Sequence, residues 1–280
     1  MSKASKASKA KSRLNSILLS FDIEEFDIPE EYGQNINEQI KLDVSRQGLE
    51  KILNILDKTN VRATFFVTAH FALHHQALIH QISEKHEIAS HGFYHSKFQV
   101  EDLHKSRLVL GELIGKSITG FRMARLQHVD DSDISQAGYK YNSSMNPTYI
   151  PGRYNNFFKP RTAYYSGNLL NIPVSVTPFI RFPLFWLSFK NFPLWFIKLA
   201  SLFTLRHDRY INLYFHPWEF IDISNFNLPG YIKNKSGKVM VDKLNKYIVW
   251  LQRQGQFVCF DELHCRVKIP RTPPYKGGIE

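Results

Sequence analysis

Short apolar runs alternate along the chain with stretches of helical periodicity. The runs that read as strands are 16–22, 61–67, 86–90, 118–123, 210–216 and 256–260. Apolar residues three and four positions apart predict helices over 49–56, 70–84, 103–114 and 241–251, the first with Asp43 as candidate N-cap. Repeated strand–helix units predict a parallel sheet covered by helices, within one domain over residues 16–266.

Polar residues at strand ends favour a barrel over an open doubly wound sheet. Asp22, His91, Arg122 and His216 each lie at or just after the carboxyl end of an expected strand. A (β/α) barrel gathers those ends around one mouth, whereas an open sheet spreads them along an edge. We therefore expect an α/β barrel with its polar residues at the mouth.

Two short motifs at that mouth carry candidate chemistry. In SFDIEEF (20–26), side-chain alternation points Asp22 and Glu24 the same way and Glu25 the opposite way. HGFYH (91–95) adds His91 and His95. One carboxylate and two imidazoles leave coordination positions open, as in a catalytic metal site, although each motif alone also fits solvated residues at a strand end.

The ordered set of motifs resembles the polysaccharide deacetylases, the NodB-like members of carbohydrate esterase family 4. SFDIEE, HGFYH, GFRMA (120–124) and LYFHPWEF (213–220) are similar to successive family motifs and occur in family order. The resemblance implies a distorted, seven-stranded (β/α) barrel with one catalytic divalent metal, most simply Zn²⁺. It also implies that Glu24, His91 and His95 bind this metal.

Carried onto this chain, the resemblance makes Asp22 the general base, Arg122 its charge partner and His216 the general acid. It places Leu213 and Phe215 around the acetyl methyl group, and Trp218 in the same motif is a candidate substrate contact. Ile23 separates the first two acids, the proline that usually follows the arginine is absent, and the acid that orients the catalytic histidine has no clear counterpart. Where the acid that orients the catalytic histidine would be expected, this chain has YNSSMNP (141–147), which offers Asn142 instead.

Two further segments are candidates for ligand contacts. RYNNFFKPRTAYY (153–165) mixes arginines with aromatic residues, so we expect a substrate loop with Arg153 as a contact. His70, His74, His75 and His80 cluster on the expected helix 70–84. Without an acid between them or a third ligand, a solvated helix face is favoured over a second metal site.

Residues 182–205 are the most apolar segment, an insertion in which eight of 24 residues are Phe or Trp. Interruptions by proline, asparagine and lysine argue against an uninterrupted membrane span, so we expect two short helices split around 191–193. They either pack on the barrel or lie in a membrane interface, with Trp186 and Trp195 as candidate lipid contacts.

Charge and composition indicate how the ends of the chain behave, which compartment suits the protein and which partners are unfavoured. The net charge is +11, and residues 1–15 carry five Lys and Arg and no acid. We interpret this opening as a disordered basic tail rather than a signal peptide, with weak attraction to anionic lipid as the alternative. Residues 267–280 are expected to form a C-terminal tail.

Two cysteines without CxxC spacing suit a reducing compartment. No pattern for nucleic-acid binding appears beyond the basic N-terminal tail.

Together these features predict a metal-dependent hydrolase that removes the N-acetyl group from an amino sugar. The expected substrate is a polysaccharide or a lipid-linked glycan precursor in surface-polysaccharide assembly. The expected location is the cytoplasm, with peripheral contact at the inner face of the membrane. Hydrolysis of a small non-peptide amide, as in allantoinase-like relatives, and a non-catalytic glycan- or membrane-binding barrel are the alternatives.

Overall fold

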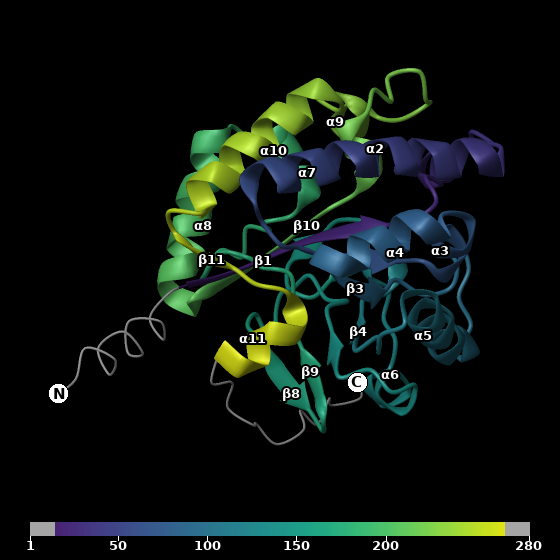
Figure 1. The fold of residues 1–280 in the computed structure, drawn as a ribbon. Helices are drawn as coiled ribbons and strands as arrows, with labels where there is room; N and C mark the ends of the chain where they lie inside the picture. The colour runs from purple at the N-terminus through teal and green to yellow at the C-terminus, as the bar shows by residue number, and fades with distance from the viewer. Residues whose placement is uncertain (1–14, 267–280) are drawn as a thin grey trace.

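A computed structural model describes residues 15–266, and its centre is a curled, mainly parallel sheet (Figure 1). Its strands pair in the order β10-β1-β2-β3-β4-β5-β9-β8, and β11 pairs with the free part of β1. All of these pairs are parallel except β8 with β9. The strands are β1 (Asn15–Ile23), β2 (Thr64–Val67), β3 (Glu87–Ser90), β4 (Gly120–Phe121), β5 (Tyr141–Asn142), β8 (Tyr164–Ser166), β9 (Leu169–Asn171), β10 (Tyr210–Phe215) and β11 (Gly255–Phe257).

The sheet curls until the segment after β9 lies beside β10. Ser175 N donates to Asn212 O at 3.0 Å, and Asn212 Nδ2 donates to the carbonyls of Ile172 and Pro173. The chain therefore forms the distorted (β/α) barrel expected from the sequence. The expected count of seven strands is not confirmed, because nine described strands join this sheet. A separate hairpin pairs β6 (Tyr149–Ile150) with β7 (Tyr154–Asn155).

Helices cover the outside of the curled sheet (Figure 1). They are α2 (Glu38–Thr59), α3 (Ala69–His74), α4 (Gln76–Lys85), α5 (Glu101–Ile114), α6 (Asp131–Gln136), α7 (Trp186–Asn191), α8 (Leu194–Asp208), α9 (Gly230–Lys233), α10 (Lys238–Leu251) and α11 (Phe260–Arg266). Three short 3₁₀ helices, η1 (Ile28–Tyr32), η2 (Ala124–Leu126) and η3 (Pro217–Phe220), lie in connections.

Side-chain alternation divides each strand between the barrel interior and the layer under the helices. On β1, Leu18 packs with Phe66 in one buried cluster, whereas Leu19 and Phe21 belong to the larger cluster under the helices. The same alternation continues to the strand's end, where it decides which polar side chains enter the mouth.

Several expected elements differ in their boundaries. The first helix begins at Glu38, because the side chain of Asn37 accepts from Gln39 N at 2.8 Å; the expected N-cap Asp43 is wrong. The expected helix 70–84 is interrupted at His75 and forms α3 and α4. The strand expected over 118–123 is only β4, two residues long.

The apolar insertion forms two helices, α7 and α8, separated at Phe192 and Pro193, as the sequence indicated. Its inner side chains, including Phe189, Ile197 and Leu205, are buried in the main core. None of the helices within residues 15–266 is both long and apolar enough to cross a bilayer. The two expected tails lie outside the described residues, except that Asn15 already belongs to β1.

Candidate active site

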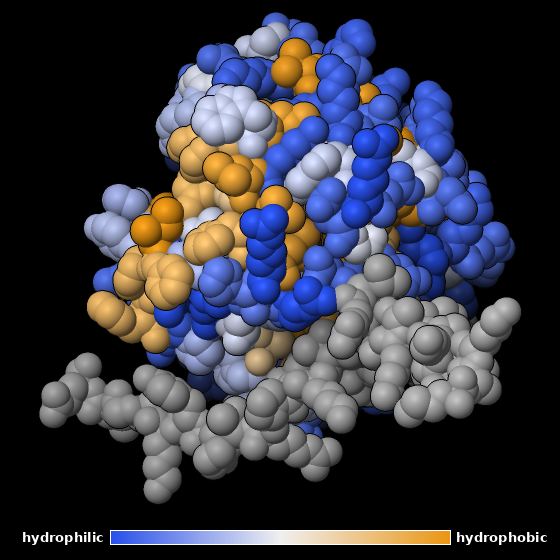
Figure 2. All heavy atoms as spheres, turned by 90° about the vertical axis from the view of Figure 1, so that its left-hand side faces the viewer, coloured by the Kyte–Doolittle hydropathy of each residue, from blue (hydrophilic) through white to orange (hydrophobic). Residues whose placement is uncertain are grey.

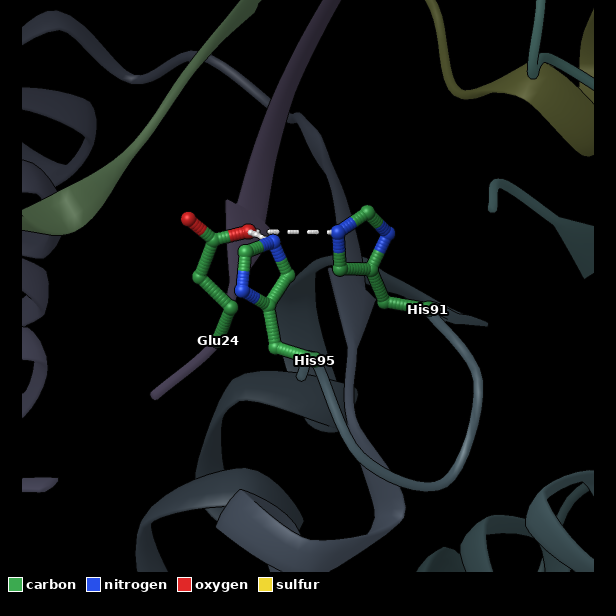
Figure 3. Close-up of side chains that lie close together, drawn as sticks. All are labelled: Glu24, His91 and His95. Carbon is green, nitrogen blue, oxygen red and sulfur yellow. Dashed lines mark hydrogen bonds and ion pairs between the residues drawn. The ribbon is translucent and has the colours of Figure 1, made fainter. Parts of the chain in front are cut away.

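Glu24, His91 and His95 meet at the barrel mouth (Figure 3). Glu24 follows β1, and the two histidines lie on the loop that follows β3. Glu24 Oε2 lies 3.0 Å from His95 Nε2 and 3.3 Å from His91 Nε2. All three side chains are buried, so the fold brings together the two motifs that the sequence had paired.

The far nitrogens of both imidazoles have acceptors of their own. His91 Nδ1 donates to the Arg122 carbonyl at 2.9 Å, and His95 Nδ1 donates to Asp27 Oδ1 at 2.7 Å. These bonds fix each ring with Nε2 facing the shared Glu24 carboxylate, where Nε2 donates a hydrogen bond when it carries a proton and can ligate a cation when it does not. Two imidazole nitrogens and one carboxylate oxygen are a donor set that suits Zn²⁺ and related divalent ions, and these residues could hold one.

The carboxylates around this set are also fixed. Trp218 Nε1 donates to Glu24 Oε1 at 3.1 Å, and Arg125 lies 3.0 Å from Asp27 Oδ2. Burial alone would raise the pKa of Glu24, but the charges of His95 and His216 and hydrogen bonds from both ligand histidines lower it well below its usual value. Burial alone would lower the pKa of His95, but Glu24 and Asp27 raise it well above its usual value. Before a cation binds, a proton on His95 therefore balances part of this buried negative charge.

Asp22 points into the same mouth from β1. Arg122 NH1 donates to Asp22 Oδ1 at 2.6 Å and to Ser20 Oγ at 2.9 Å. The guanidinium is fully buried, and Ser143 accepts from it through both its carbonyl and its hydroxyl group. This contact with Arg122 holds the Asp22 side chain in one orientation in the pocket that the three candidate ligands also line.

His216 follows β10 and lies against two tryptophan rings. It stacks on Trp218 with ring centroids 5.0 Å apart and meets the edge of Trp186 at 5.3 Å. Its backbone N donates to Glu219 Oε1 at 2.8 Å, and its Nδ1 lies 3.3 Å from the same oxygen. Burial alone would lower the pKa of His216, but Glu24 and Glu219 raise it above its usual value. A protonated His216 fits the part of a general acid.

Glu219 is the acid beside His216 that sequence reasoning did not find. The proposed stand-in, Asn142, does not reach the histidine: its side chain bonds with Asn171 and Ser144. Glu219 instead follows His216 by three positions, in a capping box at the start of η3. The His-x-x-Glu spacing in LYFHPWEF was the available signal. Lys190 Nζ, also buried, lies 3.5 Å from the other Glu219 oxygen.

One pocket joins these groups. Asp22, His216 and the three candidate ligands line it, together with an aromatic wall of Phe185, Trp186, Tyr214 and Trp218, and with Glu31, Arg125 and Arg153. Arg153 lines this pocket and also bonds Glu31 at 3.0 Å. Trp218 lies on the wall, where it holds Glu24 and stacks on His216.

Leu213 and Phe215 do not line the pocket. Both are buried in the core under α7 and α8, where Phe189 packs on Phe215 with ring centroids 5.0 Å apart. Tyr214, the residue between them, faces the pocket instead. The expectation that they surround an acetyl methyl group is therefore corrected, because on β10 the side chains of 214 and 216 share the inward face.

The histidines of α3 have a neighbouring acid after all. Glu38, at the start of α2, places Oε1 2.5 Å from His70 Nε2, and His74 lies beside them. Glu38 is 62% exposed, and an ordinary surface ion pair accounts for the contact. The solvated helix face remains the simpler interpretation of this cluster.

The sequence matches the family model described as polysaccharide deacetylase over residues 15–142. The matched part contains Asp22, the three candidate ligands and Arg122, whereas His216 lies beyond it. No protein among curated sequences matches the chain.

Solved structures share the fold at low sequence identity. A protein from Mycobacterium smegmatis assigned to the polysaccharide deacetylases has a TM-score of 0.65 and 17% identity, covering 96% of each chain. Puue allantoinase has a TM-score of 0.63 and 14% identity, covering 90% of this chain and 89% of its own. BA3943 from Bacillus anthracis, a CE4 family pseudoenzyme, has a TM-score of 0.50 and 11% identity, covering 90% and 66%. The shared barrel therefore occurs in proteins described as deacetylases, as an allantoinase and as a pseudoenzyme.

Proposed function

We propose that this chain, as a divergent member of the polysaccharide deacetylase family, hydrolyses the N-acetyl group of an amino sugar in a saccharide. The observation that carries the proposal is the single pocket that contains a candidate metal site, the Asp22–Arg122 pair and His216. A protein that only bound a glycan would need neither a base nor an acid in the same pocket as a metal site.

The reaction divides among these groups. A divalent ion bound by Glu24, His91 and His95 would polarise the amide carbonyl and lower the pKa of water. Asp22, held by Arg122 through one oxygen, accepts a proton from the water as the water oxygen bonds to the carbonyl carbon. His216 donates a proton to the amide nitrogen as the C–N bond breaks, which gives acetate and a free amine. Each proton transfer of this kind contributes about 10²–10⁴-fold to the rate.

A polar groove beside the pocket favours a saccharide over a small amide. It shares Glu31, Arg125, Leu126, Arg153 and Tyr154 with the pocket, and it extends over amide, hydroxyl and cationic side chains. These include Gln127, Asn142, Ser144, Asn156, Lys159, Tyr164 and Asn171. Side chains of this kind can form hydrogen bonds with the hydroxyl groups of neighbouring sugars. A compact amide such as allantoin has no neighbouring sugars and would leave these side chains without a ligand contact.

The biological setting belongs to the same proposal. We place the enzyme in surface-polysaccharide assembly, in the cytoplasm at the inner face of the membrane, with a lipid-linked glycan precursor as one form of substrate. Zn²⁺ is the proposed ion because its preferred ligands match the donor set.

Acetate release tests the function. The parent protein, loaded with Zn²⁺, is expected to release acetate from N-acetylglucosamine oligomers, with kcat/KM rising from one to several sugars, and to lose this activity with a chelator. Asp22→Asn and His91→Ala should each lose at least about 100-fold in kcat. His80→Ala, a surface change, is the matched control. Full activity of Asp22→Asn would reject Asp22 as the base, and hydrolysis of allantoin alone would favour the small-amide alternative.

A further inference from the structure

Six large apolar side chains form an exposed surface around α8. They are Phe179, Ile180, Phe192, Trp195, Leu199 and Phe203, which are 80, 75, 42, 68, 59 and 36% exposed. Figure 2, which views the left-hand side of Figure 1, shows apolar side chains gathered on the side of the molecule that carries α8. We call these six residues the α8 surface. Contiguous apolar surfaces of this kind mark sites of interaction.

The turn before α7 presents the first two of these side chains. Thr177 N donates to Phe182 O at 2.9 Å, and Ile180 N donates to Pro178 O at 2.8 Å, which closes a tight turn. Phe179 has a φ of 63°, a left-handed conformation that is costly for a bulky residue. The guanidinium of Arg181 donates to the carbonyls of Pro147 and Lys159 and ties the turn to the neighbouring loop. The fold therefore holds two apolar side chains outward at some cost.

Three of the other side chains follow the helical repeat along one side of α8. Positions 195, 199 and 203 are four residues apart, so they share a face, and the opposite face is buried on the barrel. Phe192 lies in the extended connection before α8 and stacks on Phe196, with ring centroids 5.4 Å apart. Phe179 and Phe203 join the turn to the helix, with ring centroids 6.4 Å apart. Trp186, which the sequence suggested as a lipid contact, is not part of this surface, because it lies in the pocket beside His216.

The charged side chains of the segment that carries the α8 surface are mainly cationic. Between Ile180 and His207 the chain has no Asp or Glu, and this segment contains Arg181, Lys190, Lys198 and Arg206, of which Lys190 is buried beside Glu219. Lys198 and Arg206 lie on α8 itself. At the start of α8, Lys243 donates to the Phe192 carbonyl and Lys235 to the Asn191 carbonyl. Asp208, at the helix end, is paired with Arg161.

We infer that the α8 surface is a docking surface for a bilayer that contains anionic lipid. Exposed aromatic and aliphatic side chains would enter the headgroup region, and the lysines and arginines around them would meet the lipid phosphates. The charge decides between occupants: a second copy of this chain would bring the same positive charge, whereas an anionic headgroup complements it. This inference does not depend on the deacetylase reaction. It does place α7, whose Trp186 and Leu187 line the pocket, directly before the lipid-facing helix.

Co-sedimentation with vesicles tests the inference. The full chain is expected to bind vesicles of phosphatidylglycerol and phosphatidylcholine, to bind pure phosphatidylcholine more weakly, and to be released by raised salt. The double variant Ile180→Ser with Trp195→Ser should bind about 100-fold more weakly, since each of the two large side chains that leaves the lipid costs about a factor of ten. Leu108→Ser with Val100→Ser removes two side chains that are 50 and 49% exposed on and beside α5, and it should bind like the parent.

A charge-reversal variant tests the inference separately, in case the double serine variant does not fold. Lys198→Glu with Arg206→Glu leaves the apolar side chains in place and should lose the preference for anionic vesicles, while hydrolysis of a soluble substrate stays unchanged. Failure of the parent to bind anionic vesicles overturns the inference. So does equal binding by the parent and the Ile180/Trp195 variant, which would assign membrane contact to another part of the chain. Concentration-dependent dimerisation that the same variant abolishes, without vesicle binding, would assign the surface to a second copy.

Discussion

At the residue scale, Glu219 acts with Glu24 to keep His216 protonated, and Glu219 is the one of the two that does not belong to the candidate metal site. Glu219 has the geometry for this part. It is fully buried and reaches the imidazole and the backbone N of His216 through the same oxygen. Glu24 also raises the pKa of His216, but a cation bound beside Glu24 would offset that charge. In the loaded enzyme, Glu219 is therefore the main group that keeps the acid protonated.

Glu219→Gln should lower the pKa of His216 while its amide oxygen still accepts from the backbone N. We expect kcat at pH 8 to fall by about tenfold or more, with the alkaline limb of the kcat profile moved to lower pH and KM little changed. A pH series of initial rates checks this, and Glu219→Asp should restore part of the parent profile. An unchanged alkaline limb in Glu219→Gln would contradict the assigned role.

His86 makes stability depend on pH at a site away from the mouth. Burial lowers the pKa of His86 to about 4, and its Nδ1 accepts from Ala63 N at 3.3 Å, a bond available only to the neutral ring. The unfolded chain therefore binds more protons between pH 6.5 and 4, so this contribution to stability is complete above pH 6.5 and is lost as the pH falls toward 4. Between pH 7 and 5 it amounts to about 2 kcal/mol.

His86→Asn keeps an acceptor near Ala63 N and removes the titration. Urea unfolding at pH 7 and pH 5 should show a smaller loss of unfolding free energy in this variant than in the parent. His80→Asn, at an exposed position of α4, should keep the parent's difference. An identical loss in His86→Asn and the parent would show that other groups cause the acid sensitivity.

At the element scale, the alternation of side chains along a strand predicted the site residues of β1, but the sequence analysis did not apply it to β10. Applied to β1, it correctly placed Asp22 and Glu24 on one face. Applied to β10, the same rule pairs His216 with Tyr214 and sends Leu213 and Phe215 to the other face, which is what the structure shows. The family resemblance had suggested the opposite, and the strand geometry overrides it.

The contact between α2 and η3 fixes the segment that carries His216. Gly48 of α2 lies so close to this segment that an added Cβ would be 1.9 Å from the Pro217 carbonyl oxygen. Only glycine allows this approach, so Gly48→Ala should push Pro217, and His216 with it, away from α2. We expect a loss of about 1–3 kcal/mol in unfolding free energy, together with a fall in kcat.

Gly111→Ala is the matched control for this change. It adds the same methyl group to a helix glycine, in α5, where the nearest atom is 3.2 Å away. Thermal unfolding and acetate release measured on both variants separate the two positions. A Gly48→Ala protein with parent stability and activity would mean that η3 is not held by this contact.

At the scale of the whole molecule, the order of strands and helices was readable from apolar periodicity, whereas long-range neighbours were not. The barrel, the two helices of the insertion and the meeting of Glu24 with His91 and His95 followed from local patterns and from the family resemblance. Asp27 and Lys190 were missed, because their places beside His95 and Glu219 depend on loops and helices that meet only in the folded chain. The ends of β4, near residue 120, could not be predicted from the sequence either, because pairing with neighbouring strands in the curled sheet decides where this strand begins and ends.

A metal at the mouth would join segments that are far apart in the sequence, and stability should report this. Glu24 follows β1, while His91 and His95 follow β3, so an ion bound by all three stabilises only the folded chain. At a free Zn²⁺ concentration 100 times the Kd, the gain is about 2.7 kcal/mol, which for a chain of this size raises the Tm by several degrees. Glu24→Gln and His91→Ala should lose this increase, and Asp22→Asn should keep it. His74→Ala should also keep it, because the Glu38–His70–His74 group on the surface is a separate cluster. If His91→Ala gained as much from Zn²⁺ as the parent while His74→Ala gained nothing, the ion would belong to the surface cluster and the barrel mouth would not be the metal site.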